Sequence, residues 1–169
     1  MIRVAVLAIS DRSFRGERED RGGPAVADAA VRLLGAEIVE TKVLPDERGD
    51  LEWNLKRLAD TDAADVVLTT GGTGLAPRDV TPQATLAVID YEAPGLAEAM
   101  RAATRGALPA AILSRQVAGV RVRTLIVNLP GSPRGAVECL EVIAPVLPHA
   151  VATLRGLPEP HPGPRIEGV

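Results

Sequence analysis

Residues 65–74 read DVVLTTGGTG, a short apolar run that ends in two threonines and a cluster of glycines. A continuous apolar run of this length is typical of a strand buried on both faces of a parallel sheet. Glycines permit a positive φ and a close approach to a ligand, so that successive N–H groups can face one anion. The stretch therefore predicts a buried parallel strand and an anion-binding loop; a tight strand-to-helix turn is the alternative.

Strand and helix patterns alternate through the rest of the chain. Strand patterns cover residues 4–9, 37–44, 111–114 and 123–129, and helical patterns cover residues 25–34, 50–59, 95–105 and 133–146, with a further helix from Pro82. This alternation predicts an α/β fold of three layers, α/β/α, with a mostly parallel sheet and helices on both faces. One domain is expected over residues 1–156, followed by a Pro-rich tail over residues 157–169.

Local signals predict where helices begin and which side chains are buried. Pro24 and Asp50 are expected at the starts of two helices, and the Thr81 side chain is expected to cap the helix from Pro82. Trp53 and Leu58 are expected in the core.

The composition argues against several classes of partner. A formal net charge of −3 gives no basic footprint for DNA or RNA, and 2% aromatic residues offer few stacking platforms for single strands. The single Cys139 cannot form an intramolecular disulfide and is expected to be a small core residue, which fits a reducing cytosol. The sequence shows no signal-peptide pattern and no apolar run of membrane-spanning length. We therefore expect a cytoplasmic protein that binds neither nucleic acid nor membrane.

Three aspartates follow predicted strands, at the edge where open α/β sheets bind their ligands. Asp79 lies shortly after the glycine loop, Asp46 follows the strand at 37–44, and Asp11 follows the first strand. A carboxylate beside a phosphate-binding loop repels the phosphate unless a metal lies between them. Mg²⁺ binds a few carboxylates together with phosphate oxygens and waters. The alternative is that Asp79 caps a helix from a turn and that the three acids belong to independent turns.

A second loop, at residues 130–133, has the same arrangement of glycine turn, hydroxyl group and proline at a helix start. Ser132 can cap this helix or bind an anion, and the two roles are compatible. Asn128 is polar at the end of an apolar strand, which favours a ligand contact. Ser114 and Arg115 end another predicted strand, where the arginine can supply a cation to phosphate.

Other catalytic arrangements find no support. His149 and His161 have no second metal ligand near them in the sequence, so a zinc site is not expected. No serine motif with a partner histidine suggests a hydrolase triad.

Five segments together resemble the molybdenum cofactor biosynthesis family, which includes MogA and MoaB. They read AISDR at 8–12, LPDE at 44–47, TTGGTGLAPRDVTPQA at 69–84, ILSRQ at 112–116 and NLPGSP at 128–133. The long central segment, with its RDVTP ending, is similar to the MogA branch. The resemblance implies transfer of AMP from Mg-ATP to the terminal phosphate of molybdopterin, with release of pyrophosphate. A MoaB-like non-catalytic molybdopterin-binding or scaffold protein is the alternative, and an enzyme acting on another phosphorylated molecule is a third possibility.

The resemblance also implies roles for individual residues. Asp46 and Asp79 correspond to the catalytic acids that hold Mg²⁺. The residues implied to bind ATP and molybdopterin are Ser10, Asp11, Gly71, Gly72, Thr73, Gly74, Ser114, Asn128, Pro130, Gly131 and Ser132. The family further implies a homotrimer and hand-over of the product to the molybdate-inserting enzyme. The chain departs from the family pattern in the loop 14–19 and in the tail. The resemblance therefore does not specify which residues form the edge of the pocket.

Overall fold

The computed structural model describes residues 1–158, so most of the predicted tail, residues 159–169, lies outside them. A six-stranded sheet in the order β2-β1-β3-β6-β5-β4 forms the centre. The strands are β1 (Arg3–Ile9), β2 (Glu37–Leu44), β3 (Val66–Thr70), β4 (Tyr91–Glu92), β5 (Ala118–Arg121) and β6 (Thr124–Leu129). Strands β2, β1, β3 and β6 are parallel, whereas β5 and β4 add an antiparallel edge.

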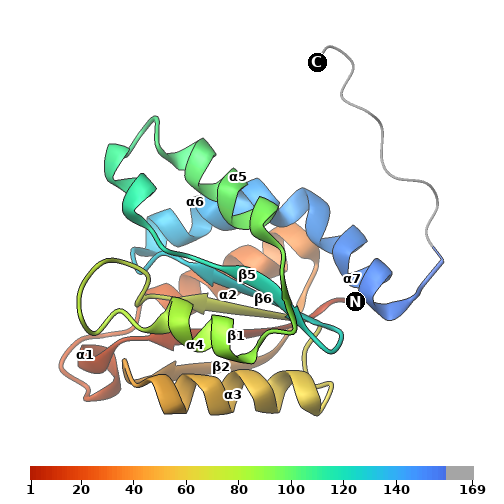
Figure 1. Cartoon of the computed structure of the whole chain (residues 1–169), viewed down its shortest axis with the longest axis horizontal. Coiled ribbons are helices and arrows are strands. Elements are labelled where there is room, and N and C mark those ends of the chain that lie inside the picture. Colours follow the sequence, from red (N-terminus) through yellow and green to blue (C-terminus); the bar gives the residue numbers. More distant parts are fainter. Residues whose placement is uncertain (159–169) are drawn as a thin grey trace.

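Helices cover both faces of the sheet, which confirms the predicted three-layer α/β architecture (Figure 1). They are α1 (Asp11–Phe14), α2 (Gly22–Leu34), α3 (Arg48–Asp60), α4 (Thr81–Val88), α5 (Pro94–Thr104), α6 (Pro133–Ile143) and α7 (Leu147–Arg155), with 3₁₀ turns η1 (Pro109–Leu113) and η2 (Ala144–Val146). Val4 and Val6 of β1 pack toward α2 and α6, while Ala5 and Leu7 pack toward α3 and α4. Side chains alternate across a strand, so a strand covered on both faces must be apolar throughout.

One of the predicted strands, at 111–114, is wrong. The run at 111–114 belongs to η1, where Ala111 N–H bonds to Leu108 O and Ser114 N–H bonds to Ala111 O. Hydrogen bonds over three residues satisfy this backbone locally, so it needs no partner strand. The structure also has a strand that was not predicted, β5, and Gly119 lies inside it. A Cβ there would lie 2.7 Å from Tyr91 O, so glycine allows β4 to approach.

The predicted core holds except at Trp53. Leu58 is fully buried and Cys139 is 3% exposed, and burial raises the pKa of the Cys139 thiol to about 11. Trp53 is 60% exposed, with Lys42 Nζ 6.0 Å and the Arg57 guanidinium carbon 5.6 Å from its ring centre. Cations on an aromatic face stabilise the ring at the surface, which explains why this side chain need not enter the core.

Two helices begin before the predicted residue. α2 begins at Gly22 rather than Pro24, because the Asp20 side chain accepts hydrogen bonds from Gly22 and Gly23 N–H. α3 begins at Arg48, which places Asp50 inside its first turn.

The segment Pro133–Arg155 is long and apolar enough to cross a membrane by length and composition alone, with a mean hydropathy of 1.5. This finding differs from the expectation that no run has this length. In the structure the segment consists of α6, η2 and α7 in succession. Leu140, Ile143 and Leu147 are at most 1% exposed and belong to the core under the sheet. One side of the segment therefore belongs to the core, while 33% of its most apolar window is buried in total.

A cluster of charged residues fastens α7 to the amino ends of the strands. Asp65 is 3% exposed, and it accepts hydrogen bonds from Arg3 N (2.7 Å), from Arg3 Nη2 (3.1 Å) and from the Arg155 guanidinium. Burial opposes ionisation, but the bonds from Arg3 and the charges of Arg155 and Arg3 lower the pKa of Asp65 overall. The carboxylate therefore links β1, β3 and the last helix.

We expect Asp65→Asn to lower the free energy of unfolding by about 2 kcal/mol at neutral pH, because two arginines lose their shared anion. Asp65 has a lowered pKa when folded, so its contribution is present above the unfolded pKa of about 4 and is lost as pH falls through the folded value. Urea unfolding at several pH values measures this.

The matched control is Asp60→Asn. Asp60 pairs with Arg121 at the surface, where its side chain is 44% exposed, and exposed pairs of this kind contribute little to stability. An Asp65→Asn protein as stable as the Asp60→Asn protein would contradict the anchoring role.

Candidate functional site

A cavity of about 590 Å³ opens where β1 and β3 end side by side. The chain leaves β1 toward α2 on one face of the sheet and leaves β3 toward α4 on the other. Such a divergence of neighbouring strands is where open α/β sheets form a ligand crevice. The lining residues come from the ends of β1 and β3, from the loop before α2 and from the loop after β6: Ala8, Ile9, Ser10, Arg18, Glu19, Asp20, Arg21, Gly22, Thr70, Gly131, Ser132 and Pro133.

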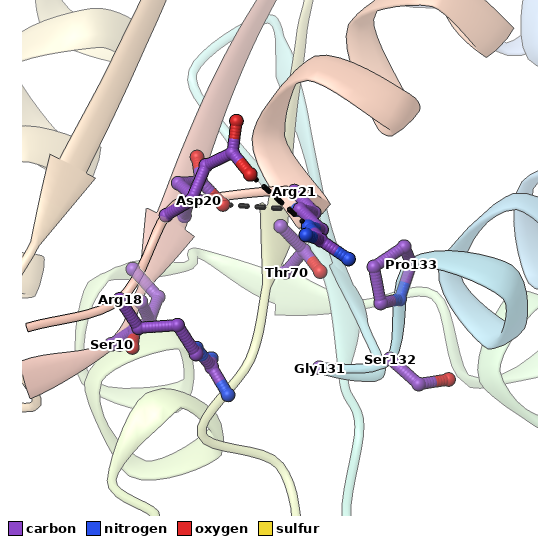
Figure 2. A pocket seen from close by; sticks show the side chains of 12 residues that line it. Ser10, Arg18, Asp20, Arg21, Thr70, Gly131, Ser132 and Pro133 are labelled. Atoms are coloured by element: carbon purple, nitrogen blue, oxygen red, sulfur yellow. Dashed lines mark hydrogen bonds and ion pairs between the residues drawn. The ribbon is translucent and has the colours of Figure 1, made fainter. Parts of the chain in front are cut away.

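The loop before α2 brings charge to this cavity, and sequence reasoning missed it. Glu19 pairs with Arg21 at 3.2 Å, and Asp20 caps α2, so these acids are engaged. Arg18 forms no hydrogen bond or ion pair with any of residues 1–158. An anion could therefore bind its guanidinium without displacing a partner within the protein. Figure 2 shows its guanidinium pointing toward the opposite wall at Gly131. The only signal in the sequence was the Gly22-Gly23 pair, because the loop itself departs from the family pattern.

The glycine loop after β3 lies against the backbone of its neighbours. Gly71 has φ 108°, and a Cβ there would lie 2.3 Å from Ile9 O. Gly72 has φ 64°, and a Cβ there would lie 2.4 Å from Thr81 Oγ1 and 3.3 Å from Asp46 Oδ1. Each of the two positions requires glycine for two reasons: the φ angle is positive, and there is no space for a Cβ. The glycine loop thus makes a close approach, as predicted, and part of this approach is to neighbouring segments of the protein itself rather than to a ligand.

A second cavity, of about 210 Å³, lies on the other side of the loop after β6. Thr73, Gly74, Ser114 and Pro130 line it, together with side chains of α5, η1 and α6. Ser132 lines both cavities, so residues 130–133 form the wall between them. The Gly131 Cα carries no side chain, and a Cβ there would lie 3.3 Å from Gly71 Cα.

Two serines at the cavity edge cap helices, as one of them was predicted to do. Ser132 Oγ accepts a hydrogen bond from Gly135 N at 3.0 Å, and Ser10 Oγ accepts one from Ser13 N at 3.2 Å. Each hydroxyl keeps its own hydrogen available as a donor toward the cavity. Thr81 does not cap α4 as predicted; its Oγ1 donates to Gly71 O at 2.9 Å and holds the glycine loop instead.

Asp11 and Asp46 bind one another's backbone. Asp46 Oδ2 accepts a hydrogen bond from Asp11 N at 2.8 Å, and Asp11 Oδ1 accepts one from Asp46 N at 3.0 Å. Burial raises the pKa of Asp46; the Asp11 N–H opposes the shift, and the charges of Asp11 and Asp79 add to it. Hydrogen bonds from Arg78 lower the pKa of Asp11. The loops after β1 and β2 are therefore interlocked through two carboxylates with different environments.

Asp79 forms a turn but does not cap α4. Its Oδ2 accepts a hydrogen bond from Ala76 N at 2.9 Å, whereas the residue before α4 is Val80 and makes no side-chain cap. Asp79 Oδ1 and Asp46 Oδ1 accept no hydrogen bond from the described residues. One oxygen of each acid is thus available to a cation.

The donor set fits Mg²⁺ better than a metal held by protein alone. Among residues 1–158 no group of three or more His, Cys, Asp or Glu side chains could hold a metal ion. Mg²⁺ is commonly bound by one or two carboxylates plus phosphate oxygens and waters. Asp46 and Asp79 supply that number, and the charge of Asp79 reaches Asp46 strongly enough to affect its pKa.

Two predicted ligand contacts have structural roles instead. Asn128 is fully buried: its Nδ2 donates to Thr69 Oγ1 (3.0 Å) and Thr85 Oγ1 (2.9 Å), and its Oδ1 accepts from Val117 N (3.2 Å). Its amide satisfies polar groups of the surrounding elements, so the expectation of a ligand contact is wrong.

Arg115 is likewise engaged within the protein. Its Nε donates to Gly74 O at 2.7 Å and its Nη2 donates to Asp79 O at 2.6 Å. The guanidinium therefore braces the glycine loop, and the expectation that it supplies a free cation to phosphate is corrected.

Comparisons with known proteins identify the family of the chain. A family described as "Probable molybdopterin binding domain" matches residues 5–149. A Helicobacter pylori protein named molybdopterin adenylyltransferase is 42% identical over 156 residues, which cover 92% of this chain and 89% of the relative. An Escherichia coli K12 protein of the same name is 46% identical over 141 residues, covering 83% and 72%.

Solved structures with the same fold carry names from both branches of the family. The molybdopterin biosynthesis enzyme MoaB from Thermus thermophilus is 49% identical, with a TM-score of 0.86 and coverage of 94% of this chain and 99% of that one. The molybdopterin biosynthesis Mog protein from Mycobacterium ulcerans is 38% identical, with a TM-score of 0.84 and coverage of 91% and 99%. The chain belongs to the molybdopterin-binding family of molybdenum cofactor biosynthesis proteins.

Proposed function

We propose that this chain is a molybdopterin adenylyltransferase, which transfers AMP from Mg-ATP to the terminal phosphate of molybdopterin and releases pyrophosphate. One observation carries the proposal: two cavities adjoin at Ser132, beside the loops that hold Asp46 and Asp79. A reaction between two separately bound anions requires neighbouring sites and groups that offset their repulsion. The name that the Helicobacter pylori and Escherichia coli relatives share supports the same reaction.

The chemistry is a displacement at the α-phosphorus of ATP. An oxygen of the molybdopterin phosphate forms the new P–O bond, the bond to the β-phosphate bridging oxygen breaks, and pyrophosphate leaves with that electron pair. This reaction is closely related to phosphoryl transfer, in which positioning and electrostatic stabilisation supply most of the catalysis. The Ser132 and Ser10 hydroxyls, the amino end of α6 and the Arg18 guanidinium are the donors that this chain directs at its first cavity.

Asp46 and Asp79 are the residues that would hold Mg²⁺. Bound there, the ion would neutralise phosphate charge and let the two anions approach. The protein prepares for this by leaving one oxygen of each acid without a hydrogen bond from residues 1–158. Asp11 has the opposite role, because Arg78 already neutralises it.

The alternative is a MoaB-like protein that binds molybdopterin without turnover; the Thermus thermophilus protein carries the name MoaB, but it is called a biosynthesis enzyme. The two acids with available oxygens favour catalysis.

Competition between pterin and nucleotide ligands would separate both of these functions from a third, an enzyme acting on another phosphorylated molecule. A homotrimer, a cytoplasmic location and hand-over to the molybdate-inserting enzyme complete the proposal.

We expect Asp79→Asn to lower turnover about 100-fold or more while the Kd for molybdopterin changes less than about threefold, because one of two Mg²⁺ ligands is lost. The assay follows adenylylated product from purified protein, molybdopterin and Mg-ATP, and Asp28→Asn on the exposed side of α2 serves as the control. Loss of pterin binding as well would make Asp79 a structural residue. No product from the unaltered protein at any Mg²⁺ concentration would reject the function.

We expect Arg18→Gln to raise the Kd for ATP about fivefold, since the first cavity loses its one cation without a partner among the described residues. Calorimetric titration with Mg-ATP in the absence of pterin measures the change. Arg15→Gln removes the same charge from the same loop, but Arg15 pairs with Glu17 outside the cavity. Equal effects of the two substitutions would show that only the general charge of the loop matters.

A further inference from the structure

We propose that Arg78 is a positioning residue that fixes the Asp46 carboxylate by way of Asp11. The inference rests on the proposed function for its catalytic consequence. Its structural part concerns only the contacts among the loops after β1, β2 and β3, which end at the same edge of the sheet.

Arg78 reaches from the glycine-rich loop to both neighbouring loops. Its Nε donates to Asp11 Oδ2 at 2.6 Å, and its Nη2 donates to Asp11 Oδ1 at 3.2 Å. The same Nη2 lies 3.2 Å from Asp46 O and 2.8 Å from Glu47 Oε1. One guanidinium therefore holds three loops, and it does so one residue before Asp79.

Besides its direct hydrogen bond to Asp46 O, Arg78 is linked to Asp46 through the Asp11 carboxylate. Asp11 Oδ1, which faces Arg78, also accepts the hydrogen bond from Asp46 N. Asp11 N–H in turn donates to Asp46 Oδ2. The Asp11 carboxylate therefore holds the backbone of Asp46, and the Asp11 backbone N–H holds one side-chain oxygen of Asp46. The other oxygen is left facing Gly72, 3.3 Å from where a Cβ would stand.

The geometry requires an arginine rather than a positive charge alone. A planar guanidinium can donate two bonds to one carboxylate in a fixed plane, whereas an ammonium acts as a point charge. The Arg78 side chain is 58% exposed, so its charge is well screened by water. Its distinctive contribution is thus the orientation of Asp11. With its donors on Asp11, Glu47 and the Asp46 carbonyl, Arg78 is engaged by the protein rather than by a substrate.

The experiment compares Arg78→Lys, Arg78→Gln and Glu47→Gln. We expect both Arg78 variants to lose about 10- to 100-fold in kcat with KM values for ATP and molybdopterin within about threefold, as for residues that orient metal ligands. Glu47→Gln keeps Arg78 on Asp11 and is expected to retain full kcat. The double variant Asp11→Asn with Arg78→Gln is expected to have a kcat no lower than that of the slower single variant. The reason is that both substitutions disrupt the same chain of contacts to Asp46.

A second readout does not need turnover: Mn²⁺ binding by electron paramagnetic resonance without substrates. Removing a cation beside acids should by charge alone tighten Mn²⁺ binding in Arg78→Gln, so weaker binding, by about fivefold or more, supports positioning. Tighter binding in Arg78→Gln, or wild-type kcat in Arg78→Lys, overturns the proposal. If the unaltered protein makes no product, the Mn²⁺ result still decides the role of Arg78, and only the proposed function fails.

Discussion

Three loops leave the carboxyl edge of the sheet with their backbones almost in contact, and the rest of the site depends on that spacing. A Cβ at Gly71 would stand 2.3 Å from Ile9 O, and one at Gly131 would stand 3.3 Å from Gly71 Cα. The loops come this close because β1, β3 and β6 are adjacent parallel strands that end together. Parallel strands covered on both faces thus bring residues distant in sequence into one crevice, and glycine permits the final approach.

Beside this crevice, rather than in the lining of either cavity, some acids are neutralised by an arginine and others keep an oxygen available. Arg78 engages Asp11 and Glu47, and Arg115 holds the backbone of the loop that carries Asp79. These arginines act on the protein itself, so a phosphate must find its donors elsewhere. Backbone N–H groups, the serine hydroxyls and Arg18 are what the two cavities provide, and Asp46 and Asp79 supply the acid pair for a cation.

The sequence allowed the layers, the parallel strands, both glycine turns and the positions of the three aspartates after strands to be predicted, because each has a local pattern. Asn128 and Arg115 were misassigned because a polar residue at a strand end looks the same whether its partner is a ligand or, as here, Thr85 or Gly74 O. The exposure of Trp53 depends on cations from β2 and α3, which only the fold brings together. Arg18 was missed since a variable loop gives no pattern that indicates which side chain faces a cavity.

In the proposed site, Asp46 and Asp79 converge on one cation beside two adjoining cavities. A crystal structure of the protein with AMP or ATP and Mn²⁺, read by the anomalous signal of the metal, tests it most directly. We expect a manganese peak coordinated by one oxygen of each aspartate, with the nucleotide phosphate in one of the two cavities that Ser132 borders. A peak that contacts neither acid, or a nucleotide bound away from both cavities, would contradict it.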